Sequence, residues 1–106
     1  MARKIIWTFG AADDLEAIVT YIARDSGFYA MSFIREIRDA SLSLKEFPER
    51  GRMVPEFSNT AVRELFIKEY RLIFKYRIEE SRIVVLGIIH GKRDLKALSE
   101  KDEWKN

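Results

Sequence analysis

The sequence predicts an α+β fold in which a helical hairpin packs on one face of a small, mostly antiparallel β-sheet. Two observations lead to this prediction. Apolar residues recur at helical spacing from Leu15 to Phe47, and the period changes to two after Thr60. The expected element order is β-α-α-β-β-β. A chain of 106 residues suffices for one domain of ordinary size, which we place at residues 1–106.

Two helices are expected after a short β-prone strand at residues 5–8. The first covers residues 13–23, with Asp13, Asp14 and Glu16 in its first turn, where carboxylates complement the helix dipole. Gly27 is expected to stop it. The second runs from residue 29 to residue 47 and ends before Pro48, because a residue before proline is pushed out of the helical region. The two apolar stripes consist of Leu15, Ile18, Val19 and Ile22, and of Phe33, Ile37, Ala40, Leu44 and Phe47.

Three strands are expected in the second half of the chain, after a loop at residues 48–60. They cover residues 62–67, 70–78 and 83–89, and residues 79–82 join the last two as a hairpin. In the strand at 70–78, Arg71, Lys75 and Arg77 fall on one face and apolar side chains on the other. We expect the helices to cover the apolar face and the basic face to be exposed, with Arg63 as a candidate neighbour. A short helix is expected in the tail, residues 92–106.

The composition excludes several classes of protein and site. The chain has no cysteine, which excludes disulfides and thiolate metal sites and suits a reducing cytoplasm. No apolar run has the length of a signal peptide or a membrane span, so we expect a cytoplasmic protein without a membrane partner. The net charge is only +2, but residues 61–97 hold nine basic and five acidic residues, a local balance of +4. The C-terminal half is therefore the better candidate for binding an anion.

Five groups of residues follow one another along almost the whole chain. They are Ala12, Asp14-Leu15, Ile18 and Tyr21-Ile22; Phe47-Pro48, Gly51-Arg52 and Val54-Pro55-Glu56; Arg63-Glu64-Leu65; Tyr70-Arg71-Leu72-Ile73-Phe74; and Ile89-His90-Gly91-Lys92-Arg93-Asp94-Leu95. In this order, the groups resemble the RelE/ParE toxin superfamily. Each group alone is loose, but the combination is specific to the superfamily. The resemblance implies the toxin of a bacterial type II toxin–antitoxin pair, neutralised by an antitoxin encoded beside it.

The resemblance implies one of two activities. ParE-like toxins poison DNA gyrase by binding it, whereas RelE-like toxins cut mRNA in the ribosomal A site. Cleavage of RNA without a metal needs a proton acceptor, cations that stabilise the transition state, and an acid. Arg71 and Arg93 match the family's cations, and His90 is a candidate base. However, Glu64 lies where RelE-like chains carry a lysine, and Ser99 lies where the family's tyrosine acid would fall.

We therefore favour a ParE-like toxin that inhibits DNA gyrase by binding and is not an enzyme. One alternative is a RelE-like, metal-independent endoribonuclease, in which Arg71, Arg93 and His90 are catalytic. A second alternative is a non-toxic homologue that binds the antitoxin and helps it to repress their promoter. The expected partners are a cognate antitoxin and gyrase, or ribosome and mRNA in the first alternative, with no cofactor and no metal. The partner-binding candidates are Arg63, Tyr70, Arg71, Lys75, Arg77, Lys92 and Arg93.

Two further side-chain roles are expected. His90 is interpreted as a structural residue, hydrogen-bonded at the end of its strand, in preference to a catalytic base. Trp7 and Trp104 are interpreted as packing residues, because neither lies within a basic cluster.

The antitoxin is expected to contribute an amphipathic segment that folds on the toxin, with acidic residues that pair with the arginines of the sheet.

Overall fold

The structure is a computed structural model that describes residues 3–100 and residue 104. Its α+β class and the order of the helices and main strands are as predicted. The helices are α1 (Phe9–Ala23) and α2 (Gly27–Ser43). The strands are β1 (Lys4–Trp7), β2 (Arg52–Met53), β3 (Val62–Ile67), β4 (Tyr70–Arg77) and β5 (Arg82–His90). Short 3₁₀ turns lie at Pro48–Arg50, Ile78–Glu80 and Leu98–Glu100.

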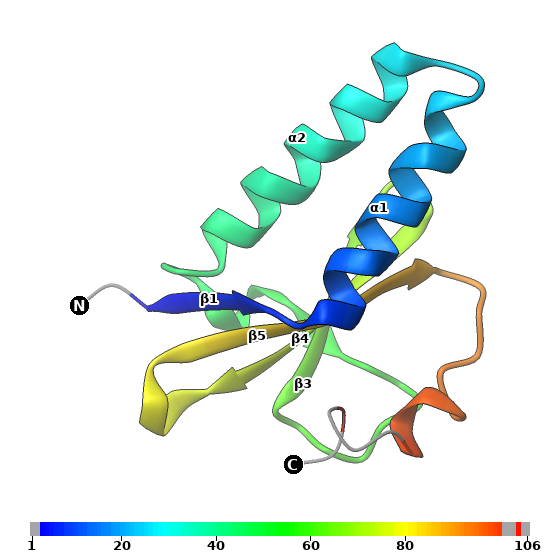
Figure 1. The fold of residues 1–106 in the computed structure, drawn as a ribbon. Coiled ribbons are helices and arrows are strands. Elements are labelled where there is room, and N and C mark those ends of the chain that lie inside the picture. The colour runs from blue at the N-terminus through cyan, green and yellow to red at the C-terminus, as the bar shows by residue number, and fades with distance from the viewer. Residues whose placement is uncertain (1–2, 101–103, 105–106) are drawn as a thin grey trace.

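The strands form one five-stranded sheet in the order β1-β5-β4-β3-β2. All neighbours are antiparallel except β1 and β5, which run parallel (Figure 1). The chain between these two strands passes through both helices and through β2, β3 and β4. β3 and β4 are joined by only two residues, and Lys68 takes the left-handed conformation at φ 54°. Glu36 of α2 holds the Lys68 ammonium at 2.7 Å, so a helix contact helps to fix this turn.

Both helices begin earlier than the sequence predicts. Thr8 caps α1, and its hydroxyl accepts a hydrogen bond from the Ala11 N–H at 3.0 Å. Ser26 caps α2 in the same way through the Tyr29 N–H at 3.2 Å. Gly27 is therefore the first residue of α2, and the prediction that it stops α1 is wrong. The serine and threonine hydroxyls determine these boundaries, and glycine does not.

The expected role of the carboxylates near the start of α1 is also wrong. Because α1 begins at Phe9, Asp13, Asp14 and Glu16 lie beyond its first turn. The Asp14 carboxylate instead accepts a hydrogen bond from the Ile88 N–H of β5 at 3.0 Å. β1 pairs with β5 only as far as Val85, so Asp14 satisfies a donor on the part of the β5 edge that β1 leaves open.

The second helix ends earlier than predicted. α2 stops at Ser43 with Leu44 as its C-cap, and turns lead from there to Pro48. Leu44 is buried as expected, but Phe47 is 62 % exposed and lies outside the core. The apolar period therefore outlasts the helix by one turn.

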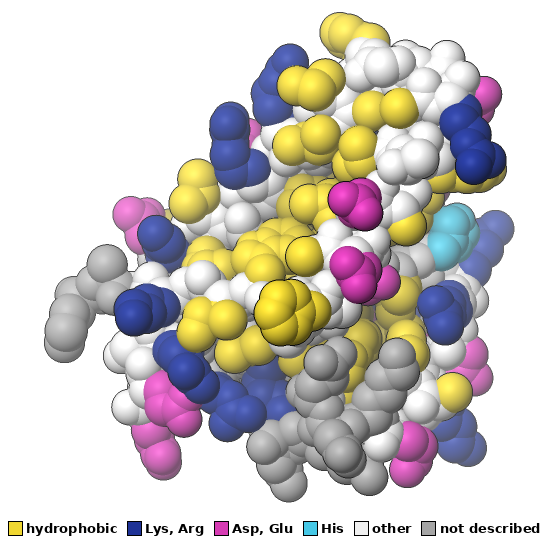
Figure 2. All heavy atoms as spheres, viewed as in Figure 1, with side chains coloured by type: hydrophobic (Ala, Val, Ile, Leu, Met, Phe, Trp, Pro, Cys, Tyr) yellow, Lys and Arg dark blue, Asp and Glu magenta, His cyan; other side chains and the backbone are white. Residues whose placement is uncertain are grey.

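A first core lies between the helices and the sheet. Phe33 and Ile37 of α2 and its C-cap Leu44 pack there with Leu72 and Phe74 of β4. The stripe of α1 is covered less well, because Ala11 is the one buried residue of this helix and the stripe residues Leu15, Ile18, Val19 and Ile22 stay half-buried. Figure 2 shows hydrophobic side chains exposed between the two helices.

The centre of the opposite face of the sheet is also covered, which corrects the prediction that Arg71 and Lys75 lie on an exposed basic face. Val54 and Leu95, from the segments before β3 and after β5, form a second core on it together with Ile73 and Trp104. Arg71 and Lys75 are therefore buried, at 4 % and 2 % exposure. Among the described residues, no helix has the length and apolar character needed to cross a membrane.

Candidate functional site

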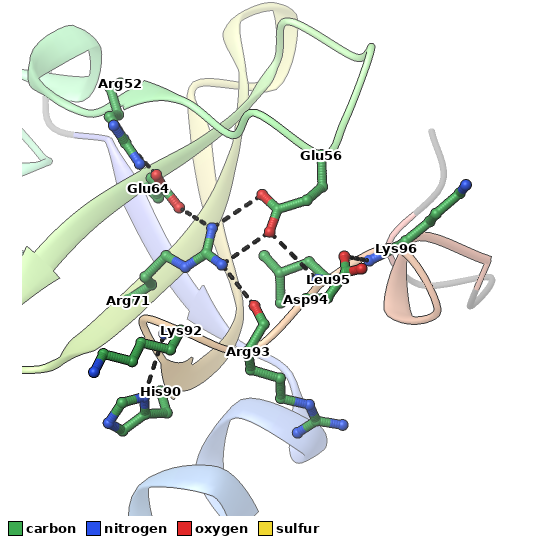
Figure 3. A network of polar contacts seen from close by, with 10 residues as sticks. All are labelled: Arg52, Glu56, Glu64, Arg71, His90, Lys92, Arg93, Asp94, Leu95 and Lys96. Atoms are coloured by element: carbon green, nitrogen blue, oxygen red, sulfur yellow. Dashed lines mark hydrogen bonds and ion pairs between the residues drawn. The ribbon is translucent and has the colours of Figure 1, made fainter.

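The centre of the covered sheet face is the guanidinium group of Arg71. Its Nη1 donates to Glu56 Oε1 and to Glu64 Oε1, each at 3.0 Å. Its Nη2 donates to Glu56 Oε2 at 2.9 Å and to the backbone carbonyl of Arg93 at 2.7 Å. Figure 3 shows these contacts converging from β3, β4, the loop before β3 and the segment after β5. Arg71 therefore connects four parts of the chain.

Glu64 reaches Arg71 because of the strand register. Glu64 pairs with Ile73, so it lies on the same sheet face as Arg71, diagonally across the β3–β4 ladder. Its side chain is fully buried, and its second oxygen accepts a hydrogen bond from the guanidinium of Arg52 on β2. Arg52 in turn lies over the ring of Phe66 at 5.0 Å. A buried carboxylate here is satisfied by two arginines.

Glu56 fastens the C-terminal segment to this network. It lies in the turn that follows Val54 and accepts a bidentate pair from Arg71. Its Oε2 also lies 3.4 Å from the backbone nitrogen of Leu95, which donates to it. Hydrogen bonding by Arg71 holds the pKa of Glu56 below its ordinary value, and the same bonds raise the pKa of Arg71. Both groups are therefore charged at neutral pH.

One nitrogen of the Arg71 guanidinium makes no hydrogen bond to the described residues. Nε is buried and has no hydrogen-bond partner among the described residues, whereas both terminal nitrogens are fully engaged. A phosphate that approached Arg71 would have to displace a carboxylate or the segment after β5. In this conformation the guanidinium serves as a structural cation.

His90 ends β5 at the surface. Its Nδ1 accepts a hydrogen bond from the Lys92 N–H at 3.2 Å, and its ring packs edge-on against Tyr70 at 5.6 Å. In a neutral imidazole this bond assigns the proton to Nε2, so the exposed nitrogen is a donor. Tyr70 also packs against Phe33, and burial raises its pKa.

The remaining basic candidates lie in three separate places. Lys92 and Arg93 are exposed in the turn after β5, and the Arg93 side chain extends away from Arg71 (Figure 3). Arg77 lies half-buried at the end of β4. Arg63 pairs with Phe74, so it lies on the helix face, where it donates to the carbonyls of Thr60 and Gly51. The expectation that Arg63 flanks Arg71 and Lys75 is therefore wrong.

Trp104 has the packing role predicted for it. It is buried at 4 % exposure, and its ring lies 5.8 Å from that of Phe57. The position of Gly87 makes room for it, because a Cβ there would lie 2.9 Å from the Trp104 ring and 3.0 Å from the Asp14 carboxylate. Trp7 is half-buried against the first core.

The sequence pattern does not predict the two carboxylates that define the site. Glu64 differs from the lysine expected of RelE-like chains, but its register partner Ile73 places it on the same sheet face as Arg71. Glu56 lies in an irregular loop, and no pattern indicates its partner. Within residues 3–100 and residue 104, no group of three or more His, Asp or Glu side chains gathers where it could hold a metal ion.

Comparisons with known proteins agree with this fold. A family model described as the ParE toxin of the type II toxin–antitoxin system parDE matches residues 5–95. The chain is 31 % identical over 90 residues to Toxin RelE2 of Caulobacter vibrioides, a match that covers 85 % of this chain and 97 % of that one.

Solved structures show the same architecture. The chromosomal ParDE toxin–antitoxin system of P. aeruginosa matches with a TM-score of 0.67 and 23 % identity, over 83 % of this chain and 95 % of that one. Isolated RelE of E. coli matches with a TM-score of 0.62 and 14 % identity, over 93 % and 94 %. The RelBE2 complex of Mycobacterium tuberculosis gives 0.59 and 18 %, over 85 % and 99 %. Together with the family model, these matches show that the chain belongs to the ParE toxin family of the RelE/ParE superfamily.

Proposed function

We propose that this chain is the toxin of a type II toxin–antitoxin pair, that it inhibits DNA gyrase by binding, and that a cognate antitoxin neutralises it. The observation that most favours binding over RNA cleavage is the state of Arg71. Its guanidinium is buried, and two carboxylates and a backbone carbonyl occupy its terminal nitrogens. A transition-state cation must instead point into a space that the substrate enters.

The geometry around His90 supports the same choice. A general base needs a free lone pair within reach of the hydroxyl that it deprotonates. In His90 the Nδ1 lone pair is used by the Lys92 N–H. The Arg93 side chain extends away from Arg71 (Figure 3), so the three candidates for catalysis do not face a common space.

The helical hairpin supplies the surface that supports an antitoxin. The α1 side chains Leu15, Ile18, Val19 and Ile22 are only half-buried, and hydrophobic side chains are exposed between the helices (Figure 2). An amphipathic segment that folds on the toxin would cover this apolar surface. The solved relatives support a partner of this kind, because ParDE is a toxin–antitoxin system and RelBE2 is a toxin–antitoxin complex.

The first test is a gyrase supercoiling assay with purified, antitoxin-free protein, scored for both inhibition and linearised plasmid. We expect inhibition together with accumulated cleaved DNA. A Lys92→Gln/Arg93→Gln variant tests whether the exposed basic turn contributes, with Arg35→Gln/Arg38→Gln on the solvent side of α2 as the control of equal charge. A larger loss in the first variant supports a contact role for Lys92 and Arg93.

The alternatives predict other outcomes. If folded protein does not inhibit gyrase but cuts mRNA on ribosomes, the RelE-like endoribonuclease becomes the assigned function. Arg71, Arg93 and His90 would then be the next residues to replace. Protein that has neither activity and causes no growth arrest on expression would identify a homologue that binds an antitoxin and helps it to repress transcription.

A further inference from the structure

Three basic residues lie side by side across neighbouring strands at one end of the sheet. Lys4 of β1 and Arg77 of β4 are both register partners of Arg82, the first residue of β5. Register partners point to the same face of a sheet, about 5 Å apart. These three residues, the basic row, therefore span about 10 Å of sheet surface. We propose that the basic row binds the phosphate backbone of duplex DNA.

The basic row lies on the face opposite the helices. Ile83 belongs to the core beneath the helices, and Val84 packs against the second core, so Arg82 shares the face of Val84. Lys4 is exposed, and Arg77 and Arg82 are half-buried. In Figure 2, basic side chains gather around the end of the sheet where β1 begins and the β4–β5 hairpin turns.

The charges of the basic row are poorly compensated within the chain. Like charges directly opposite one another on paired strands destabilise a sheet. Neither Lys4 nor Arg77 has an ion-pair partner among the described residues, and Arg82 has one, Glu80 at 2.6 Å. Both members of that pair are partly exposed, so the pair adds little stability and an anion can replace it. A bound phosphate would relieve the repulsion within the row.

A hollow beside the basic row brings further charged groups close to it. It encloses about 270 Å³, and its lining includes Lys75, Arg77 and Asn59 together with the acidic residues Glu79 and Glu80. Burial lowers the pKa of Lys75, and the positive charge of Arg77 lowers it further. This direction agrees with Lys75 and Arg77 lying close together. The two glutamates reduce the attraction, so we expect weak binding that does not depend on base sequence.

The surroundings favour a duplex over a single strand. Proteins that hold single strands stack the bases on aromatic side chains. The described positions that follow the basic row on the same face are Ile6, Val84 and Lys75, and none is aromatic. Tyr76 lies on the helix face, where the Arg3 guanidinium covers its ring at 5.7 Å. The positions next to the basic row in the strand ladders therefore offer no stacking platform, which suits a duplex backbone better than a single strand.

The test is fluorescence anisotropy of a labelled 20-base-pair duplex across a series of salt concentrations, without gyrase. The variant is Lys4→Gln/Arg77→Gln/Arg82→Gln. The control, Arg24→Gln/Arg35→Gln/Arg38→Gln, removes the same charge from exposed positions on the helical hairpin. Each lost phosphate contact lowers the slope of log K against log salt by about 0.9, so the variant should lose a slope of about 2.7. We expect at least about tenfold weaker binding at low salt and little change in the control.

Three results would overturn the proposal. The first is binding by the variant that equals wild type, and the second is an equal loss in variant and control, which would mean that net charge alone matters. The third is tighter binding of a single-stranded RNA of the same length, which would exclude the duplex. A thermal melt shows that the variant is folded, and relief of repulsion should keep its Tm at or above that of wild type. These outcomes are independent of whether gyrase is the target.

Discussion

Replacing Arg71 with methionine removes the cation but keeps an apolar side chain of similar length. It leaves Glu64, whose side chain is fully buried, with Arg52 as its one remaining partner among the described residues. Removing one member of a buried ion pair costs about 3 to 5 kcal/mol, because the other charge stays desolvated. Arg52, whose side chain is 58 % exposed, still pairs with Glu64 and compensates part of its charge. The Glu56 side chain is 21 % exposed, so water can replace part of its lost pairing with Arg71. We therefore expect a loss of about 3 kcal/mol, the lower end of that range.

Urea denaturation followed by circular dichroism measures this loss. In a domain whose stability is about 5 to 15 kcal/mol, a loss of about 3 kcal/mol is large and lowers Tm by about 12 °C or more. Adding Glu64→Gln to Arg71→Met should restore part of the stability, because the buried charge is gone. Arg35→Met, at an exposed position of α2, is the matched control and should change stability by less than about 0.5 kcal/mol.

A loss below about 1 kcal/mol in Arg71→Met, with no recovery in the double variant, would refute this reasoning. It would mean that the network opens readily in solution and that Arg71 is available to an external anion. The nuclease alternative would then become the stronger one. The stability measurement therefore also tests the functional assignment.

Two further changes give separate predictions. Because Arg71 depresses the pKa of Glu56 in the folded state, the contribution of Glu56 is complete above its unfolded value of 4.5 and is lost as pH falls through the lower folded value. The stability difference between wild type and Glu56→Gln should thus be constant above about pH 5 and shrink below about pH 4, and a difference that grows on acidification would contradict the ion pair. Gly87→Ala places a methyl group 2.9 Å from the Trp104 ring. In a Trp7→Phe background, the tryptophan emission should shift to the red as Trp104 leaves its buried position, and unchanged emission would argue against that contact.

Much of the fold follows from local patterns in the chain. β3 occurs at the predicted residues because alternation and β-propensity agree there. The helix starts differ from prediction because the hydroxyls of Thr8 and Ser26 cap them. Each hydroxyl accepts a hydrogen bond from the N–H three residues later, and these caps outweigh the glycine and carboxylate signals. A cap of this kind leaves only a weak trace in the sequence.

The candidate site was harder to predict, because it depends on contacts between distant segments. The alternation of β4 places Arg71 and Lys75 on one face correctly, but no local signal shows that this face is covered. The cover comes from irregular segments that contribute Glu56 and Trp104, and such segments carry no periodicity. Alternation identifies the face of a strand, whereas burial depends on what packs there.

The half-covered stripe of α1 has a consequence for how long the free toxin survives in a cell. A helix that buries little apolar surface opens locally at low free-energy cost, so its amide protons should exchange faster than those of β4 and β5. A partner that covers the stripe stabilises the folded form by about 2.7 kcal/mol when its free concentration is a hundred times Kd. Proteases that cleave opened chains would therefore remove free toxin faster than bound toxin, and the amount of toxin would follow the supply of its partner.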